Sequence, residues 1–201
     1  MNIEDYTLVT LDFETYYGRG YSLGRADTNT IDYVCDPRFK IHCVGVKVDD
    51  DPVIMFKEDE MSQFEQFMSE LSNSGEPIAL LCHNTAFDAF ILHHHFDWHP
   101  HFYLDTMSMS KGMFVGAPAN LKHLSTRLWP ANSGMRKGEE LALSKDIRDL
   151  PPELMDLIAD YCVQDVTLTY EAFKIMHAHF PDDEMYLCRA VVLCGHTTHT
   201  S

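Results

Sequence analysis

The hydrophobic pattern at the start of the chain predicts a buried strand. Residues 6–14 contain Leu8, Val9, Leu11 and Phe13 in a nearly continuous apolar run. Runs of this kind are typical of strands that are covered on both faces of a sheet. We therefore expect this segment to be the first strand of the fold and to lie at the centre of its sheet.

The same pattern predicts the remaining elements. Short apolar runs favour strands at residues 41–48, 53–56, 78–82 and 102–104, the first two joined as a hairpin by an acidic turn. Apolar residues at helical spacing predict helices over 60–71 and 84–96, helical segments up to about 129, and a long helix from 152 to about 179. The long helix should bury a stripe made of Leu154, Leu157, Ile158, Tyr161 and Cys162. Residues 17–36 and 131–139 are polar and contain glycine, so we expect connecting loops there.

This order of elements predicts an α/β fold with a mixed central sheet that is flanked by helices. Strands come first and then alternate with helices, as in proteins whose helices cover a sheet. A chain of 201 residues is long enough to bury a substantial core. We expect one globular domain.

The charge of the chain narrows the classes of function. Acidic residues outnumber basic ones by 31 to 15, which leaves a formal net charge of −16. This sign argues against a module that grips duplex DNA through many phosphate contacts. It is compatible with an enzyme that gathers carboxylates around metal ions and holds single strands by stacking.

The composition also bears on location and on metal binding. The sequence has no stretch of about 18 uncharged apolar residues, so we expect a cytoplasmic protein without a membrane partner. Six cysteines are scattered without a Cys-x-x-Cys pair and are expected to be free thiols. The histidine-rich run 93–101 lacks a familiar zinc spacing and is expected to be a mostly solvated helix end.

Candidate chemistry begins with two acids at the end of the first strand. Asp12 and Glu14 are two residues apart, so their carboxylates project from the same face of the strand. A shared divalent cation would relieve their repulsion and their loss of hydration. For this pair alone, a solvated strand end is the simpler explanation.

Two further pairs lie on predicted helices. Asn84 is placed to cap the helix that follows residues 78–82, and Asp88 comes one turn later, where the helix dipole favours an acid whatever its function. Tyr161 and Asp165 are four residues apart and share a helical face, which a core tyrosine and an exposed aspartate would also explain. Taken alone, the first of these pairs favours a structural role, and the second is explained equally well by structure and by catalysis.

Taken together and in this order, the three pairs resemble the motifs of the DEDD superfamily of 3′-to-5′ exonucleases, in the subclass whose third motif has a tyrosine. The surrounding segments are similar to the N-terminal proofreading domains of phage family A DNA polymerases: Asp12-Phe-Glu-Thr-Tyr16, Tyr33-Val-Cys-Asp-Pro-Arg-Phe39, Leu104-Asp-Thr-Met107 and residues 161–169. The similarity covers residues 7–187. It implies a ribonuclease H-like fold, with an exonuclease domain over 1–187 and an atypical tail over 188–201.

The resemblance also implies a reaction and its cofactors. The reaction is hydrolysis at the 3′ end of single-stranded DNA, with release of nucleoside 5′-monophosphates. Two hard divalent ions, Mg²⁺ or Mn²⁺, suit a site that offers carboxylate oxygens. Their ligands would be Asp12, Glu14, Asp88 and Asp165, with Asp12 bridging both ions and Asp88 acting through water. Tyr161 would orient the attacking water, because a phenol is a poor general base at neutral pH.

Substrate contacts follow from the same resemblance. Thr15 and the backbone near Phe13 would border the terminal nucleotide, and Asn84 and Phe87 would line the path of the strand. Phe87 fits a core position equally well. Asp105 matches a family position near the site, and a structural role at a strand end is as consistent with its place. Four basic residues in predicted loops are candidate phosphate contacts, although scattered surface charge is the simpler explanation: Lys111, Lys122, Arg136 and Lys137.

Two other functions remain open. RNA trimming of the ribonuclease D kind uses the same residues, and a catalytically silent nucleic-acid-binding module would share the fold. The presence of all five site residues argues against a silent module. A separately encoded DNA polymerase is a candidate partner, since the resembling domains are joined to a polymerase. If the chain is phage-encoded, its location would be the cytoplasm of the host cell.

Overall fold

Five strands form one mixed sheet in the computed structural model, which describes residues 3–23 and 28–180. In spatial order they are β3 (Ile54–Lys57), β2 (Ile41–Val48), β1 (Thr7–Thr15), β4 (Ile78–Cys82) and β5 (Phe102–Asp105). β1 is antiparallel to β2 and parallel to β4, and β2 and β3 form the predicted hairpin. The predicted mixed sheet and the central position of its first strand are therefore confirmed. The tail at 188–201 lies outside the described residues.

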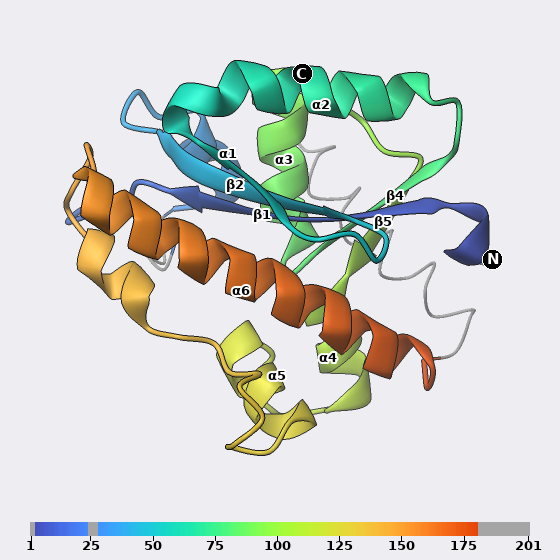
Figure 1. Ribbon diagram of the computed structural model, residues 1–201. Coiled ribbons are helices and arrows are strands. Elements are labelled where there is room, and N and C mark those ends of the chain that lie inside the picture. Colours follow the sequence, from blue (N-terminus) through green and yellow to red (C-terminus); the bar gives the residue numbers. More distant parts are fainter. Residues whose placement is uncertain (1–2, 24–27, 181–201) are drawn as a thin grey trace.

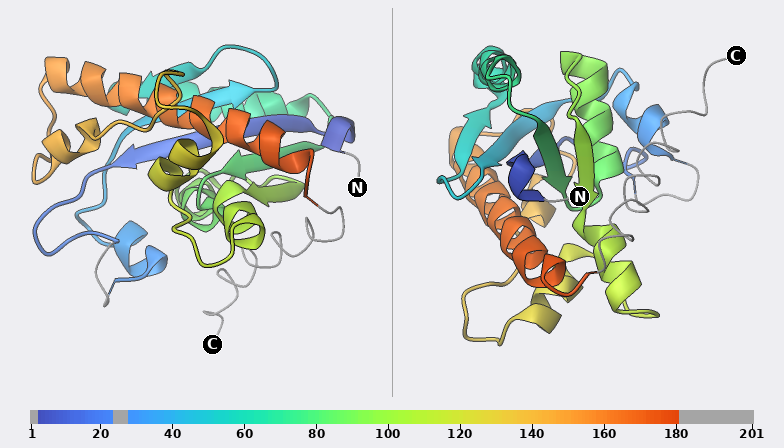
Figure 2. Two further views of the ribbon diagram at one scale, coloured as in Figure 1. Left: turned by 90° about the horizontal axis from the view of Figure 1, so that it is seen from below. Right: turned by 90° about the vertical axis from the view of Figure 1, so that its right-hand side faces the viewer.

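Helices cover both faces of this sheet (Figures 1 and 2). On one face lie α2 (Met61–Asn73) and α3 (Thr85–Phe96), and the short α1 (Thr30–Val34) packs against α3. The long α6 (Pro152–His177) crosses the other face, where it contacts α4 (Thr106–Met113) and α5 (Leu121–Leu128). No helix in the described ranges is long and apolar enough to cross a bilayer.

The alternation of side chains along β1 divides the core in two. Val9, Leu11 and Phe13 face α2 and α3 and belong to one buried cluster. Leu8 belongs to the cluster on the other side, with residues of α6. Because successive strand residues point to opposite faces, Asp12 and Glu14 also face α6. The polar pair therefore lies between the sheet and the longest helix of the fold.

Gly45 allows α6 to approach the sheet closely at this place. It lies on β2 directly opposite Asp12 in the antiparallel register. A Cβ atom on Gly45 would come within 3.0 Å of Val166 and 3.2 Å of the Cys162 sulfur. Cys162 and Val166 lie one helical turn apart on α6 and, with Ile158, form the stripe of that helix that packs on the sheet.

Two predictions about local structure were wrong. The segment 17–36 was expected to be a loop, but it contains α1, whose N-cap Asn29 accepts a hydrogen bond from the Asp32 amide. The ring of Tyr33 on α1 stacks on the ring of Tyr21 with 4.4 Å between their centroids, so α1 packs against an earlier part of the same segment. Leu157 was expected in the buried stripe of α6, but it is 36% exposed because the stripe runs through the neighbouring Ile158.

Candidate active site

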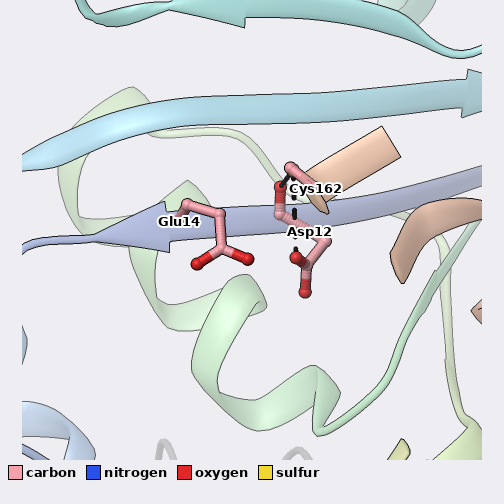
Figure 3. A group of neighbouring side chains, drawn as sticks. All are labelled: Asp12, Glu14 and Cys162. Atoms are coloured by element: carbon pink, nitrogen blue, oxygen red, sulfur yellow. Dashed lines mark hydrogen bonds between the residues drawn. The ribbon is translucent and has the colours of Figure 1, made fainter. Parts of the chain in front are cut away.

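Two carboxylates and a thiol meet at the carboxyl end of β1. Asp12 and Glu14 project from the same side of the strand, toward α6, where Cys162 lies above Asp12 (Figure 3). Candidate ligand atoms of these three residues lie within 4.8 Å of one another, and no other group of three such residues occurs in the ranges 3–23 and 28–180. The Cys162 thiol donates to the backbone oxygen of Asp12 at 3.3 Å. The predicted convergence of Asp12 and Glu14 is thus present in the structure.

Asp88 joins this group from the opposite layer. It lies in the first turn of α3 and is 2% exposed. Its Oδ1 accepts a hydrogen bond from the backbone amide of Phe13 at 3.1 Å. Phe13 lies between Asp12 and Glu14 in the sequence, so this bond holds the Asp88 carboxylate beside the part of β1 that carries the two acids.

Tyr161 and Asp165 come from α6 and are both buried, at 4% and 2% exposed. The exposed aspartate that an ordinary amphipathic helix would show is therefore excluded. Asp165 Oδ2 pairs with the ammonium of Lys137, which comes from the loop before the short helix η3 (Glu140–Ser144). The same ammonium stands 4.5 Å from the centre of the Tyr161 ring.

The four acids disfavour one another's charge. Burial and the nearby charge of Asp165 raise the pKa of Asp12 to about 7. Burial and Asp12 raise the pKa values of Glu14 and Asp88 well above their ordinary range, and burial raises that of Asp165. Such a group is stabilised by cations, because a cation favours the charged forms.

The donor set fits hard divalent ions. Asp12 interacts electrostatically with Glu14, Asp88 and Asp165, all of which offer carboxylate oxygens. Oδ1 of Asp165 is buried with no hydrogen-bond partner in the described chain. Oxygen donors of this kind are those that Mg²⁺ and Mn²⁺ prefer. Cys162 differs, because a hydrogen bond with Cys43 and burial raise its pKa, so it stays a neutral thiol that donates to Asp12.

Tyr161 is unsuited to abstract a proton. Burial, together with the charges of Asp165, Glu14 and Asp12, raises its pKa far above the ordinary value of a phenol. Its hydroxyl is therefore protonated at every pH at which the protein would work. It can donate a hydrogen bond beside Asp165, which is the chemistry of an orienting group and not of a base.

An open pocket of about 410 Å³ adjoins the acids. Its walls are mainly aromatic and aliphatic, and Glu14 forms one edge; the lining residues are Phe13, Glu14, Thr15, Tyr17, Ser22, Leu23, Tyr33, Phe87 and Leu141. A planar group bound there would lie against apolar walls with Glu14 at their edge. Phe87 thus lines a cavity and also lies against the core cluster, which combines the two roles considered for it.

The other residues expected to contact substrate have mixed outcomes. Thr15 lies in the pocket wall, where its hydroxyl shares a hydrogen bond of 2.9 Å with Tyr33. The Phe13 ring packs in the core against Phe64 and Phe96, so only part of it reaches the pocket. Asn84 was expected to cap α3 with its side chain, but it makes no such bond. It has φ 81°, a left-handed conformation that asparagine tolerates better than most residues.

Asp105 takes the capping role instead. Its Oδ1 accepts from the amides of Asn84 at 2.8 Å, Thr85 at 3.3 Å and Met107 at 3.1 Å. Its Oδ2 accepts from the amide and the hydroxyl of Ser108. One carboxylate therefore satisfies the first amides of both α3 and α4, whose free N–H groups need partners. Between the two readings of Asp105, these contacts favour the structural one.

Comparison with known proteins identifies solved structures with a similar fold. No protein family and no curated protein matches the sequence. Among solved structures, Trypanosoma brucei RNase D in complex with RNA U12 superposes with a TM-score of 0.58 at 13% identity, covering 96% of this chain and 63% of that one. Brucella melitensis NrnC with bound Mg²⁺ gives 0.56 at 16% identity, covering 96% and 85%. The family B DNA polymerase of Pyrobaculum calidifontis gives 0.58 at 13% identity, covering 85% of this chain and 24% of the polymerase.

The chain has a ribonuclease H-like exonuclease fold. The predicted fold class is confirmed by these neighbours, with the five-stranded sheet order and the flanking helices described above. The chain spans less than two thirds of the RNase D structure and about a quarter of the polymerase. The closer resemblance to phage family A polymerases stays a prediction.

Two residues near the acids of this ribonuclease H-like fold were not assigned to them from the sequence. Cys162 was read only as part of a buried stripe, yet its thiol contacts Asp12. Lys137 was one of four basic residues expected in loops, a placement that is wrong for Lys111 on α4 and Lys122 on α5. Of the four, Lys137 is the one that pairs with Asp165. Neither contact has a local signal, because the partners are 150 and 28 residues apart.

Proposed function

We propose that this protein is a metal-dependent 3′-to-5′ exonuclease of the DEDD superfamily with a tyrosine in its third motif. The observation that carries the proposal is that four acids from three different elements, three of them buried and Asp12 half-buried, lie near one another. Asp12 and Glu14 come from β1, Asp88 from α3 and Asp165 from α6. Asp165 raises the pKa of Asp12, and Asp12 raises the pKa values of Glu14 and Asp88, which supports a shared site around Asp12.

The proposed cofactors are two divalent ions, Mg²⁺ or Mn²⁺. Asp12 would bridge both, Glu14 and Asp165 would complete one ion site, and Asp88 would serve the other through water. Bound ions of this kind activate a water and neutralise charge on the phosphoryl group. The hydroxyl of Tyr161, beside Asp165, would orient the attacking water without taking its proton.

The pocket beside Glu14 is the proposed site for the terminal nucleotide. Base stacking on apolar walls tolerates any sequence, as an exonuclease requires. Thr15 and Phe87 line this pocket, and Asn84 lies just before the helix that carries Phe87 and Asp88. A base held there would leave the adjacent phosphodiester facing the acids. The net charge of −16 also favours a few stacked nucleotides over an extended duplex.

Single-stranded DNA is the first proposed substrate, on the basis of the motif resemblance to proofreading domains. RNA is the second candidate, because the RNase D structure that shares this fold contains RNA. A separately encoded DNA polymerase is the proposed partner if the domain proofreads. A silent binding module is disfavoured, because the chain has all four proposed ligands and Tyr161.

The test is cleavage of a 5′-labelled single strand with Mg²⁺, with Mn²⁺ and with a chelator. Asp12→Asn should lower the rate by at least about 10³-fold, since metal ions supply several kcal/mol of transition-state stabilisation. Asp97→Asn is the matched control, because Asp97 has a fully exposed side chain and a left-handed φ of 48° that asparagine accepts. Matched DNA and RNA strands would identify the preferred sugar. Cleavage that survives chelation or the Asp12 substitution would overturn the proposal.

A further inference from the structure

Lys137 brings a positive charge into the group of acids. Its side chain is 24% exposed, and its ammonium pairs with Oδ2 of the nearly buried Asp165. Burial disfavours the charged lysine, but the attraction of Asp165, Asp12 and Glu14 outweighs burial and raises the pKa of Lys137 above its ordinary value. The ammonium thus lies at the acids and is not a solvated surface charge.

The surroundings of Lys137 hold it in this position. Its backbone amide donates to the hydroxyl of Ser125, a buried residue of α5, at 3.4 Å. Its ammonium lies over the Tyr161 ring, 4.5 Å from the centroid. An aromatic face attracts a cation, so this contact adds to the pairing with Asp165. Lys137 is anchored at its backbone and held at its tip by two of the proposed site residues.

We propose, on the basis of the function proposed above, that Lys137 is a further catalytic residue whose ammonium contacts the scissile phosphate. Charge develops on the phosphoryl oxygens during hydrolysis, and a fixed cation that is partly shielded from water stabilises it strongly. In the metal-free protein the ammonium pairs with Oδ2 of Asp165, a proposed metal ligand. Oδ1 of the same carboxylate has no hydrogen-bond partner in the described chain. Divalent ions and the ammonium therefore compete for Asp165.

This arrangement makes an unusual prediction for Lys137→Met, which keeps the length of the side chain and removes its charge. The variant should bind Mn²⁺ about fivefold more tightly, because a competing positive charge has been removed. Its kcat should nevertheless fall by about 10²-fold, the size typical of removing one donor to a transition-state charge. Lys137→Arg keeps the charge and should retain a measurable part of the activity.

Lys174 offers a matched control. It also pairs with an acid, Glu171, at 3.2 Å and stands over a tyrosine ring, that of Tyr170, at 5.1 Å. It lies on the exposed side of α6, away from the four acids. Lys174→Met should therefore leave both Mn²⁺ affinity and kcat within about twofold of the parent, as surface substitutions usually do.

The experiment measures Mn²⁺ binding by the loss of the free-ion electron paramagnetic resonance signal, and kcat with a labelled strand. Tighter binding together with lower kcat supports the proposal. If Lys137 has a purely structural role, Lys137→Met should have lower Mn²⁺ affinity, lower kcat and a lower melting temperature. If Lys137 only competes with the metal ions, kcat of the variant should be unchanged or higher. Either result would overturn the proposal. If the parent protein cleaves nothing, the nuclease proposal fails. The Mn²⁺ affinities of the parent and Lys137→Met then test whether the ammonium competes with metal ions for Asp165. Equal affinities would overturn this competition.

Discussion

The carboxylate of Asp88 accepts a hydrogen bond from the backbone amide of Phe13, a residue 75 positions earlier in the chain. Phe13 lies between Asp12 and Glu14 in β1, so the bond joins α3 to the strand at the acids themselves. Burial, followed by the charge of Asp12, raises the pKa of Asp88. The hydrogen bond from Phe13 by itself lowers this pKa, but it holds the acid at a buried place near Asp12, where burial and the neighbouring charge outweigh it.

Asp88→Asn should therefore stabilise the metal-free protein while lowering its activity. Asparagine keeps an oxygen for the Phe13 amide and removes a charge that the other acids disfavour. We expect the free energy of unfolding in chelator at pH 8 to rise by about 1 kcal/mol, because substitutions that remove an unfavourable charge from a functional site commonly stabilise a protein. Urea denaturation measures this, with Asp97→Asn as the control. A less stable Asp88→Asn would show that the charge is well compensated in the folded state.

His42 should make stability depend on pH. Its ring is fully buried, both ring nitrogens are without hydrogen-bond partners in the described chain, and burial followed by Lys40 lowers its pKa to about 4. The folded state thus holds neutral histidine, whereas the unfolded chain binds a proton below pH ~6.5. The contribution to stability is complete above pH ~6.5 and is lost as the pH falls to about 4, by up to about 3 kcal/mol.

The comparison with His42→Leu isolates this effect. Other titrating groups are common to both proteins, so the difference in their free energies of unfolding between pH 7 and pH 4 reports His42 alone. We expect the parent to lose stability relative to the variant across this window, with no further relative loss below it. A constant difference would mean that His42 titrates alike in the folded and unfolded chains.

Gly45→Ala should separate the sheet from α6. The added Cβ would meet Val166 at 3.0 Å and Cys162 at 3.2 Å, which is closer than normal packing allows. We expect a loss of about 1–3 kcal/mol from overpacking. Because Gly45 lies opposite Asp12, the shift of α6 should also move Asp165 away from Asp12 and lower kcat.

Ile78→Val is the control for that experiment. It costs about 1 kcal/mol by removing one methyl group from the core cluster on the α3 side of the sheet. Thermal unfolding and cleavage rates should show that it is destabilised and active below its melting temperature. An equal loss of activity in both variants would attribute the Gly45 effect to stability alone.

Asp105→Ala should be destabilising through the loss of two helix caps. Its carboxylate accepts five hydrogen bonds from Asn84, Thr85, Met107 and Ser108, and removing it leaves the first amides of α3 and α4 without that partner. We expect a loss of about 2–4 kcal/mol. Asp105→Asn keeps one acceptor oxygen and should lose less. Chemical denaturation gives both values, and an unchanged stability of Asp105→Ala would contradict the capping role.

Local pattern was enough to predict most of the elements and their order. The apolar run around Leu11 predicted a central strand, and two-residue spacing placed Asp12 and Glu14 on one face, because these periods belong to the strand itself. The four-residue spacing of Tyr161 and Asp165 likewise placed them on one face of α6. Elements with weak periodicity could not be predicted in this way, as with α1 in the segment 17–36.

The sequence by itself therefore determined the strand and helix order, the mixed sheet and the pairs of polar residues that each element displays. Only the tertiary structure decided that Asp105 caps α3 in place of the Asn84 side chain, that Cys162 contacts Asp12, and that Lys137 pairs with Asp165. The physical reason is that spacing within one element sets which side chains share a face. The packing of separate elements, through close approaches such as that at Gly45, sets which faces meet.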